Sequence, residues 1–399
     1  MINKFYMDNK SIIFAARYMF PVTSSAIKNG AVYVRNGIIY DFGDLKKITL
    51  RYKDAVVREL GSGILMPGFI NAHTHLELGS LKAKLEPGDS FPSWILEILK
   101  YRLGLTKKKA IESVQKGIES LIRSGVVGVG EISTLGYDVE PLSKSHLYTV
   151  LFKEYTSAKK LNTGMFKSSD SMEQRPFLHA PYSTSSEAYI LASKLFNTYG
   201  THIAESIDEF KLITGKSNEF IKKFSPFIRR KPLMRRSISP VDYIFRLGFL
   251  DKNATLVHFV HIDKYDLELA RVHNSGIVLC PRSNAYLGVG LPRIDLLYDY
   301  PRVGLGTDGL SSNVSLDMTE EIRFLYLMSR PVIKEKAEFF AIRAATIGSA
   351  MSLFIEDKLG SIEKGKLGAL IYLDTEITKN LYLSIINTQS SQIRNLTDV

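Results

Sequence analysis

The most informative stretch of the chain is Ile64-Leu65-Met66-Pro67-Gly68-Phe69-Ile70-Asn71-Ala72-His73-Thr74-His75. It is an apolar run that ends in two histidines, and we expect a single buried strand from residue 64 to residue 75. His73 and His75 are one residue apart, so on a strand both imidazoles point to the same face. Two imidazoles on one face favour a metal such as zinc or iron. Alone, such a pair is a weak indication of a metal site.

Seven further apolar runs follow this one, and amphipathic helices are expected between most of them. The expected strands span residues 126–133, 148–155, 176–182, 200–205, 254–262, 276–281 and 302–307. Eight units of strand then helix predict a parallel (β/α)8 barrel. A doubly wound open sheet is the alternative, but no glycine-rich dinucleotide motif follows any of these strands.

Both ends of the chain have β character. Near the N-terminus, short strands are expected at residues 11–15, 30–34 and 37–41. Asn36-Gly37 between the last two is a strong hairpin signal. Near the C-terminus, residues 360–373 contain a glycine-rich turn followed by a strand. We therefore predict a composite β-sandwich domain from residues 1–63 and 356–399, and a catalytic barrel from residues 64–355.

Composition limits the class of protein. The 399 residues are 45% hydrophobic and 23% charged, which is ordinary for a soluble globular protein. No apolar run approaches the ~20 residues of a membrane span, and residues 1–9 lack the apolar stretch of a secretion signal. The one cysteine, Cys280, excludes an intramolecular disulfide, and we expect it to be a buried strand residue rather than a nucleophile. These features predict a cytoplasmic protein with no membrane partner.

The formal net charge of +11 is compatible with an anionic partner or with a lysine-rich, soluble surface. Nine basic residues and one acid, Glu219, lie between residues 211 and 236. No aromatic ladder, helix-turn-helix signature or zinc-finger spacing accompanies them. We expect a solvated helix face and no nucleic-acid partner; steering of an anionic substrate is the other interpretation.

Catalytic residues of such a barrel lie at the C-terminal ends of its strands. Six of the eight histidines fall at or near the predicted strands: His73, His75, His179, His202, His258 and His261. His202 and Asp308 would complete a shell of three nitrogens and one carboxylate, with room for a water. A metal held there would lower the pKa of that water toward neutrality.

Two further residues suggest proton transfer. Glu205, three residues after His202, could lean over the site as a proton shuttle, or could cap the next helix. His258 could orient the water, or could be a core histidine, and His261 is its rival on the same strand. We expect structural or exposed positions for the remaining histidines, His146 and His273.

Four stretches resemble motifs of the amidohydrolase superfamily. Residues 67–75 (PGFINAHTH) resemble its first-strand motif, and residues 305–313 (LGTDGLSSN) resemble its eighth-strand motif. Residues 179–183 (HAPYS) and 202–206 (HIAES) are similar to the branch that holds adenosine-type deaminases, guanine deaminase and triazine hydrolases. The resemblance implies a (β/α)8 barrel with a composite β-sandwich and a metal-dependent hydrolytic activity.

The resemblance also implies roles for individual residues. One divalent ion, zinc or iron, would be bound by His73, His75, His202 and Asp308. Asp308 would also accept a proton from the attacking water, Glu205 would deliver it to the ring nitrogen, and His258 would polarise the water. His179 matches a histidine that contacts the substrate. No lysine at the end of the fourth strand is suited to bridging two metals, so one metal is expected.

Within that branch, three stretches are most similar to the aminodeoxyfutalosine deaminases: residues 76–78 (LEL), 88–94 (GDSFPSW) and 280–284 (CPRSN). The substrate of that family is a nucleoside of menaquinone biosynthesis with an adenine base and a benzoate-bearing arm. A carboxylate on the arm would favour an arginine as its partner. Arg102 is the first candidate, followed by Arg282, Arg235 and Arg236, and each could equally be a surface or helix-capping residue. The ribose-binding glutamate of methylthioadenosine-type deaminases is missing, because Leu103 stands in its place nine residues after Trp94.

The sequence therefore predicts a hydrolytic deaminase of a small-molecule nucleoside, converting 6-amino-6-deoxyfutalosine to futalosine and ammonia. Deamination of S-adenosylhomocysteine, methylthioadenosine or guanine, or hydrolysis of a cyclic amide, are the alternatives within the superfamily. A scaffold that has lost catalysis is disfavoured, because all four ligands and the acid are present. The oligomeric state stays open, with a homodimer as one option.

Overall fold

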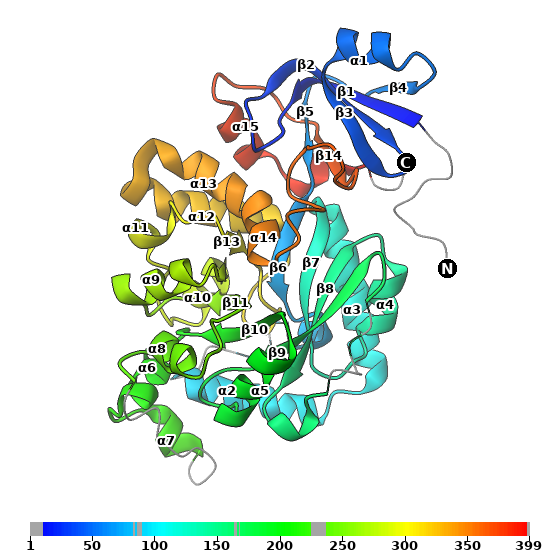
Figure 1. The fold of residues 1–399 in the computed structure, drawn as a ribbon. Coiled ribbons are helices and arrows are strands. Elements are labelled where there is room, and N and C mark those ends of the chain that lie inside the picture. The colour runs from blue at the N-terminus through cyan, green and yellow to red at the C-terminus, as the bar shows by residue number, and fades with distance from the viewer. Residues whose placement is uncertain are drawn as a thin grey trace.

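The computed structural model describes residues 11–82, 84–85, 90–162, 166, 168–224 and 237–396. The strands within these ranges form two sheets, one of eight strands and one of seven (Figure 1). No helix in the described ranges is long and apolar enough to cross a membrane.

The eight-stranded sheet is the barrel, and each of its strands pairs in parallel with the next. Its strands are β6 (Phe69–Thr74), β7 (Val126–Ser133), β8 (Tyr148–Tyr155), β9 (Met172–Leu178), β10 (Thr198–Ile203), β11 (Asn253–His258), β12 (Gly276–Leu279) and β13 (Val303–Leu305). The two ends of the sheet meet where the Asp308 N–H donates to the carbonyl of His73 (3.0 Å) and the Asn71 amide donates to Thr307 Oγ1 (2.7 Å). The predicted (β/α)8 barrel is confirmed.

Helices surround this barrel and connect its strands. They are η1 (Leu76–Leu81), α2 (Phe91–Leu103), α3 (Lys107–Arg123), α4 (Val139–Lys144), α5 (Ser186–Leu195), α6 (Ile207–Thr214), α7 (Glu219–Phe224), α8 (Pro240–Arg246), α9 (Lys264–Val272), α10 (Pro281–Tyr286), α11 (Ile294–Leu297), α12 (Met318–Ile333), α13 (Ala337–Ala344) and α14 (Ile347–Ser352). The longest, α3, begins after Thr106, whose side chain accepts from the Lys109 N–H. It buries Ala110, Val114 and Leu121, a helical spacing that places one apolar stripe on the core.

The seven-stranded sheet is built from both ends of the chain, as predicted (Figure 1). It contains β1 (Ser11–Met19), β2 (Ile27–Arg35), β3 (Ile38–Asp44), β4 (Val56–Glu59), β5 (Ile64–Pro67), β14 (Leu370–Leu373) and β15 (Ile393–Asn395), with α1 (Leu45–Arg51) and α15 (Leu381–Asn387) beside it. Asn36 and Gly37 have φ of 50° and 74°, the conformation of the expected hairpin turn. The division of the chain at residues 63 and 356 stays a prediction.

The expected single strand from residue 64 to residue 75 is wrong. The run contains β5, which pairs with β1 and β14 in the small sheet, and β6, which belongs to the barrel. Gly68 lies at the change of sheet, and a Cβ there would come within 2.2 Å of Val127 Cγ1. Both strands are buried on both faces, so their apolar run continues across the break without a change of pattern.

Cys280 is buried, as predicted, but it follows β12 and precedes the first turn of α10 instead of lying in a strand. The expected strand at residues 276–281 therefore ends earlier, at Leu279. Pro281 directly follows Cys280 and is well suited to the first position of α10, because a backbone N–H at that position makes no hydrogen bond within the helix.

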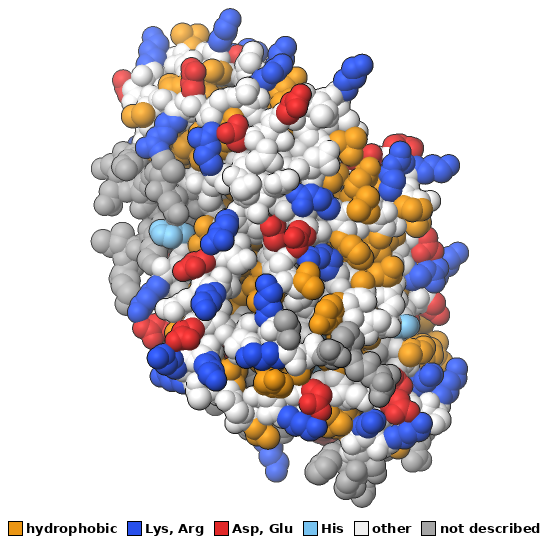
Figure 2. Space-filling model, turned by 180° about the vertical axis from the view of Figure 1, so that it is seen from behind, with side chains coloured by type: hydrophobic (Ala, Val, Ile, Leu, Met, Phe, Trp, Pro, Cys, Tyr) orange, Lys and Arg blue, Asp and Glu red, His pale blue; other side chains and the backbone are white. Residues whose placement is uncertain are grey.

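Basic side chains are spread over the face shown in Figure 2, where acids lie among them. Within the basic run at residues 211–236, Lys222 and Lys223 are exposed on α7, as expected of a solvated helix face. Lys222 Nζ lies 2.6 Å from Glu219 Oε1. Residues 225–236, which include the candidates Arg235 and Arg236, lie outside the described residues.

We expect Gly68→Ala to lower the free energy of unfolding by about 1–3 kcal/mol, because the added methyl group would overlap the Val127 side chain at the junction of the two sheets. Gly104→Ala is the control: the atom nearest to its added Cβ is 3.7 Å away, so its effect should stay within about 0.5 kcal/mol. Denaturant unfolding of both variants measures the difference. Equal stabilities would contradict a packing role for Gly68.

Candidate active site

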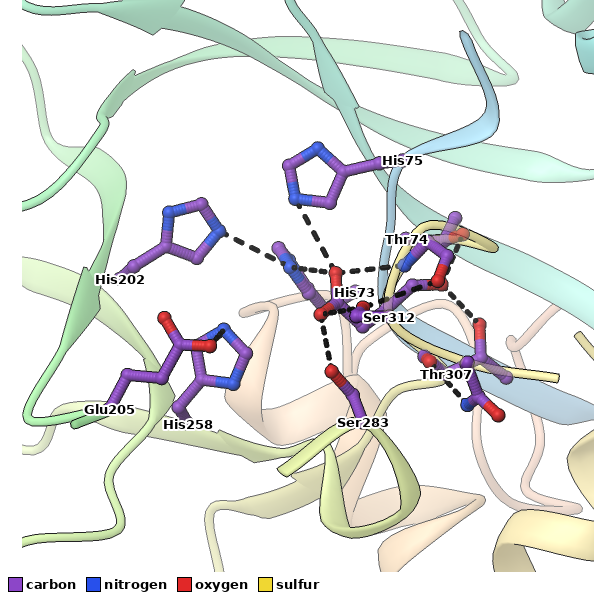
Figure 3. A network of polar contacts seen from close by, with 12 residues as sticks. His73, Thr74, His75, His202, Glu205, His258, Ser283, Thr307 and Ser312 are labelled. Carbon is purple, nitrogen blue, oxygen red and sulfur yellow. Dashed lines mark hydrogen bonds and ion pairs between the residues drawn. The ribbon is translucent and has the colours of Figure 1, made fainter. Parts of the chain in front are cut away.

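Three histidines converge at the C-terminal end of the barrel strands. His73 lies on β6, His75 is the first residue after β6, and His202 lies on β10. One ring nitrogen from each lies within 4.8 Å of the other two, and Nε2 of His73 is 3.3 Å from Nε2 of His202. Figure 3 shows the three rings pointing toward one another. The three histidines therefore lie close enough to hold one metal ion, and their role as ligands stays a prediction.

The histidines fit a divalent metal in spacing and in protonation. Two nitrogens bound to one zinc ion lie roughly 3–3.5 Å apart, given Zn–N distances of about 2.0–2.1 Å. Nδ1 of His202 is 2.9 Å from the His179 carbonyl, so Nδ1 carries the proton and Nε2 presents its lone pair to the site. Burial, with a further contribution from His73, lowers the pKa of His75 to about 4 and holds that of His202 well below its usual range. Neutral imidazoles are the form that binds metal.

Asp308, which follows β13, supplies the carboxylate. Its Oδ1 is 3.6 Å from Nε2 of both His73 and His75. Its Oδ2 accepts hydrogen bonds of 2.7 Å from the hydroxyls of Ser283 and Ser312. The two serines hold one oxygen and thereby aim the other at the histidines, as the partners of metal ligands commonly do.

Glu205 and His258 lie beside this cluster (Figure 3). Nε2 of His258 is 3.5 Å from Oε1 of Glu205. Burial raises the pKa of Glu205 well above its usual range, and the charges of Asp308 and Glu209 raise it further. A carboxyl group with a raised pKa can hold a proton at neutral pH, as a general acid requires.

The Asn284 amide fixes the tautomer of His258. Its Nδ2 lies 3.1 Å from Nδ1 of His258, and because an amide nitrogen only donates, Nδ1 is the acceptor and Nε2 carries the proton. Burial lowers the pKa of His258 to about 3, so the ring is a neutral donor. His261, its rival on the same segment, instead places Nε2 2.6 Å from the Val289 carbonyl and does not line the cavity among the described residues.

A cavity of about 720 Å³ opens over these groups. His75, His202, Glu205, His258 and Asp308 line its polar floor. Its wall is aromatic and aliphatic and includes Phe91, Trp94, Ile95, Ile98, Tyr182, Phe220 and Phe224. The rings of Tyr182 and Phe220 stack at 4.4 Å, and those of Phe91 and Trp94 stack at 5.7 Å. A large apolar pocket with convergent polar groups at one end is typical of a small-molecule site.

The predicted substrate contacts divide into two groups. His179 and Arg102 both line the cavity. Arg282 is not among the described lining residues, because its guanidinium is held by Glu320 (2.7 Å) and Glu321 (3.5 Å) of α12. The prediction that Arg282 binds substrate therefore finds no support in its position.

Sequence reasoning missed four residues with evident positions in the site. Ser283 and Asn284 lie in a stretch quoted for its resemblance, but no role was assigned to them. Glu77 accepts the N–H groups of Thr134, Leu135 and Tyr137 and so holds the loop after β7 against the cavity. Glu154 lines the cavity from β8. Its place near the C-terminal end of a predicted strand was the signal that could have revealed it.

Residues 64–397 match the amidohydrolase family. The chain belongs to this family. The prediction of a hydrolase that acts on C–N bonds is thereby confirmed at the level of the family.

Curated relatives of the chain include three kinds of deaminase. The aminodeoxyfutalosine deaminase of a Nitratiruptor species is 28% identical over 296 residues, which are 70% of this chain and 71% of the relative. The adenosine deaminase of Helicobacter pylori is 29% identical and covers 83% of this chain and 85% of its own length. The 5-methylthioadenosine/S-adenosylhomocysteine deaminase of Thermodesulfovibrio yellowstonii is 25% identical over 92% of this chain and 85% of its own length.

Two solved structures share the fold. The crystal structure of Helicobacter pylori aminofutalosine deaminase with methylthio-coformycin has a TM-score of 0.83 at 23% identity, and covers 96% of this chain and 99% of its own. The crystal structure of an adenosine deaminase from Xanthomonas campestris with bound zinc has a TM-score of 0.82 at 20% identity, and covers 96% of this chain and 90% of its own.

Adding Zn²⁺ to chelator-treated protein should raise the melting temperature, because a ligand at 100 times its Kd stabilises the folded state by about 2.7 kcal/mol. His73→Asn should abolish the shift. His261→Gln is the matched control, a histidine in the same end of the barrel that should leave the shift intact. A shift retained in His73→Asn would contradict this site.

Proposed function

We propose that this chain is a hydrolytic deaminase of the adenine ring of a nucleoside, and that its substrate is 6-amino-6-deoxyfutalosine. The observation that carries the proposal is the floor of the cavity. Three histidines, the Asp308 carboxylate and a protonatable Glu205 meet there under an aromatic wall. A planar aromatic base fits such a wall, and hydrolysis at the base needs the acid and the metal at the floor.

The metal would be held by His73, His75, His202 and Asp308, and nitrogen ligands with one carboxylate suit zinc or iron. When bound, it supplies Lewis-acid activation of water. Asp308 accepts a proton from the attacking water, and Glu205 protonates the ring nitrogen as water adds to C6. The neutral His258, with its proton on Nε2, donates to the incoming oxygen. Collapse of the tetrahedral adduct breaks the bond between C6 and the amino nitrogen: Asp308 passes its proton to the departing amino group, which leaves as ammonia, and the proton of the C6 hydroxyl returns to Glu205.

The arm of the nucleoside would point to the mouth of the cavity along α2. Ile95, Ile98 and Leu99 of this helix line the cavity, and Leu103 at its end is 91% exposed. Arg102 is the one arginine among the described lining residues. An aromatic arm that ends in a carboxylate matches an apolar wall followed by a guanidinium. Relatives named aminodeoxyfutalosine deaminase support this choice of substrate.

A second candidate is deamination of methylthioadenosine or S-adenosylhomocysteine. The apolar wall of α2 would also receive a thioether arm, and relatives of that name match most of this chain. The floor of the cavity would act on the adenine base of either substrate in the same way. The two candidate activities therefore differ only in which arm of the nucleoside the cavity wall accepts.

Metal-loaded protein should convert 6-amino-6-deoxyfutalosine to futalosine, with release of ammonia and the absorbance change from adenine to hypoxanthine. We expect its kcat/KM to exceed that of 5′-methylthioadenosine and S-adenosylhomocysteine by at least about 10-fold, since 5′-methylthioadenosine has no carboxylate for Arg102 and the arm of S-adenosylhomocysteine also carries an ammonium group. A reversed order would favour the second candidate. No deamination of any adenine nucleoside would refute the activity.

Glu205→Gln should lower kcat by about 10²–10⁴-fold, because the amide cannot transfer a proton to the ring. Metal content should stay at the wild-type value, since Glu205 does not belong to the histidine cluster. Steady-state kinetics measure the loss of kcat, and elemental analysis measures the metal content. Glu140→Gln makes the same chemical change on the exposed surface of α4 and should leave kcat unchanged. An active Glu205→Gln would exclude the proton-transfer role.

A further inference from the structure

Glu154 is a buried acid that the proposed reaction does not use. It lies near the end of β8, lines the cavity, and has a side chain that is only 8% exposed. An acid is rarely buried to this extent unless charged or polar groups compensate it. Its position on the cavity wall makes the substrate one of those groups.

The neighbours of Glu154 place it between the two ends of the cavity. Its Oε2 is 3.9 Å from Nη1 of Arg102, at the mouth, and its Oε1 is 3.9 Å from Nε2 of His179. Burial alone would raise its pKa, but the neighbouring imidazole of His179, the charge of Arg102 and a side-chain hydrogen bond with Thr134 outweigh burial and lower the pKa below its usual value. Glu154 is therefore a carboxylate midway between the metal-binding histidines and the arginine.

Both of these distances are too long for a direct hydrogen bond. Each carboxylate oxygen therefore lies near a nitrogen without bonding to it directly, although the carboxylate also has a side-chain hydrogen bond with Thr134. A hydroxyl group both donates and accepts, so one hydroxyl on the cavity side of this pair could donate to Oε2 and accept from Arg102. A second hydroxyl could donate to Oε1 beside the imidazole of His179. Oε1 and Oε2 belong to the same carboxyl group of Glu154, so two hydroxyls that bind them must lie close together in the ligand.

We propose that Glu154 binds the vicinal 2′- and 3′-hydroxyl groups of the ribose and so selects ribonucleosides. The inference rests on the proposed function, which puts the base at the floor and the arm at the mouth, and leaves the sugar in between. A diol is uncharged and can donate to the Glu154 carboxylate without adding a second charge beside it. A hydrogen bond to a charged group is also stronger than one between neutral groups.

The test compares binding of inosine and 2′,3′-dideoxyinosine by calorimetry, since neither carries the amino group that would be hydrolysed. Wild-type protein should bind inosine at least about 100-fold more tightly, as expected for two hydrogen bonds to a carboxylate. Glu154→Gln keeps the size of the side chain and should reduce this ratio below about 10-fold, because it removes the charge. Glu140→Gln is the matched control and should keep the wild-type ratio.

Equal binding of the two nucleosides by wild-type protein would overturn the proposal without any variant. So would a ratio that survives Glu154→Gln in protein whose melting temperature is unchanged. If Glu154 instead binds the ammonium group of an amino-acid arm, the variant would weaken S-adenosylhomocysteine more than 5′-methylthioadenosine, which also overturns it. Diol-dependent binding without deamination of any adenine nucleoside would refute the proposed activity and support the role of Glu154.

Discussion

The site depends on the closure of the barrel. The Asp308 N–H donates to the His73 carbonyl, and the Thr74 hydroxyl donates to the Asp308 carbonyl (3.1 Å). These bonds join the first barrel strand to the segment after the last one, more than 230 residues away. Gly306 permits this approach, because a Cβ there would lie 2.8 Å from the backbone of His73. Without closure, the imidazoles and the carboxylate would not share one point in space.

The segments after the strands are held in an unfavourable backbone conformation. Ala204, His258 and Asp308 have φ of 53°, 77° and 57°, in the left-handed region that residues with a Cβ rarely adopt. Such residues cost of order 1–3 kcal/mol each and persist only where their surroundings hold them. Here the surroundings are specific: the Ser283 and Ser312 hydroxyls hold Asp308. The turns point their side chains back over the barrel, which a straight continuation of each strand would not do.

The barrel and the clustering of the histidines could be predicted because the apolar runs of the strands, and the polar residues at their ends, are visible in the sequence. Parallel buried strands read as apolar runs, and catalytic side chains gather where those runs end. The break between the two strands at Gly68 could not be predicted from the sequence. Strands β5 and β6 are both buried, so the apolar pattern continues without interruption from one sheet to the other. The position of Arg282 could not be inferred either. Its partners Glu320 and Glu321 are on a helix whose placement depends on the closed barrel.

Chemistry and specificity are carried by different parts of this chain. The floor of the cavity is formed by residues at strand ends, which the hydrogen-bonded barrel holds rigidly. Solved structures named for different deaminases share the fold that provides it. Much of the wall is formed by η1, α2 and α7, which lie in the connections after β6 and β10. Connections tolerate change in length and composition far better than barrel strands do. Under the proposed function, a change of nucleoside arm would therefore require new residues on α2 and α7, while the histidines, Asp308 and Glu205 could stay as they are.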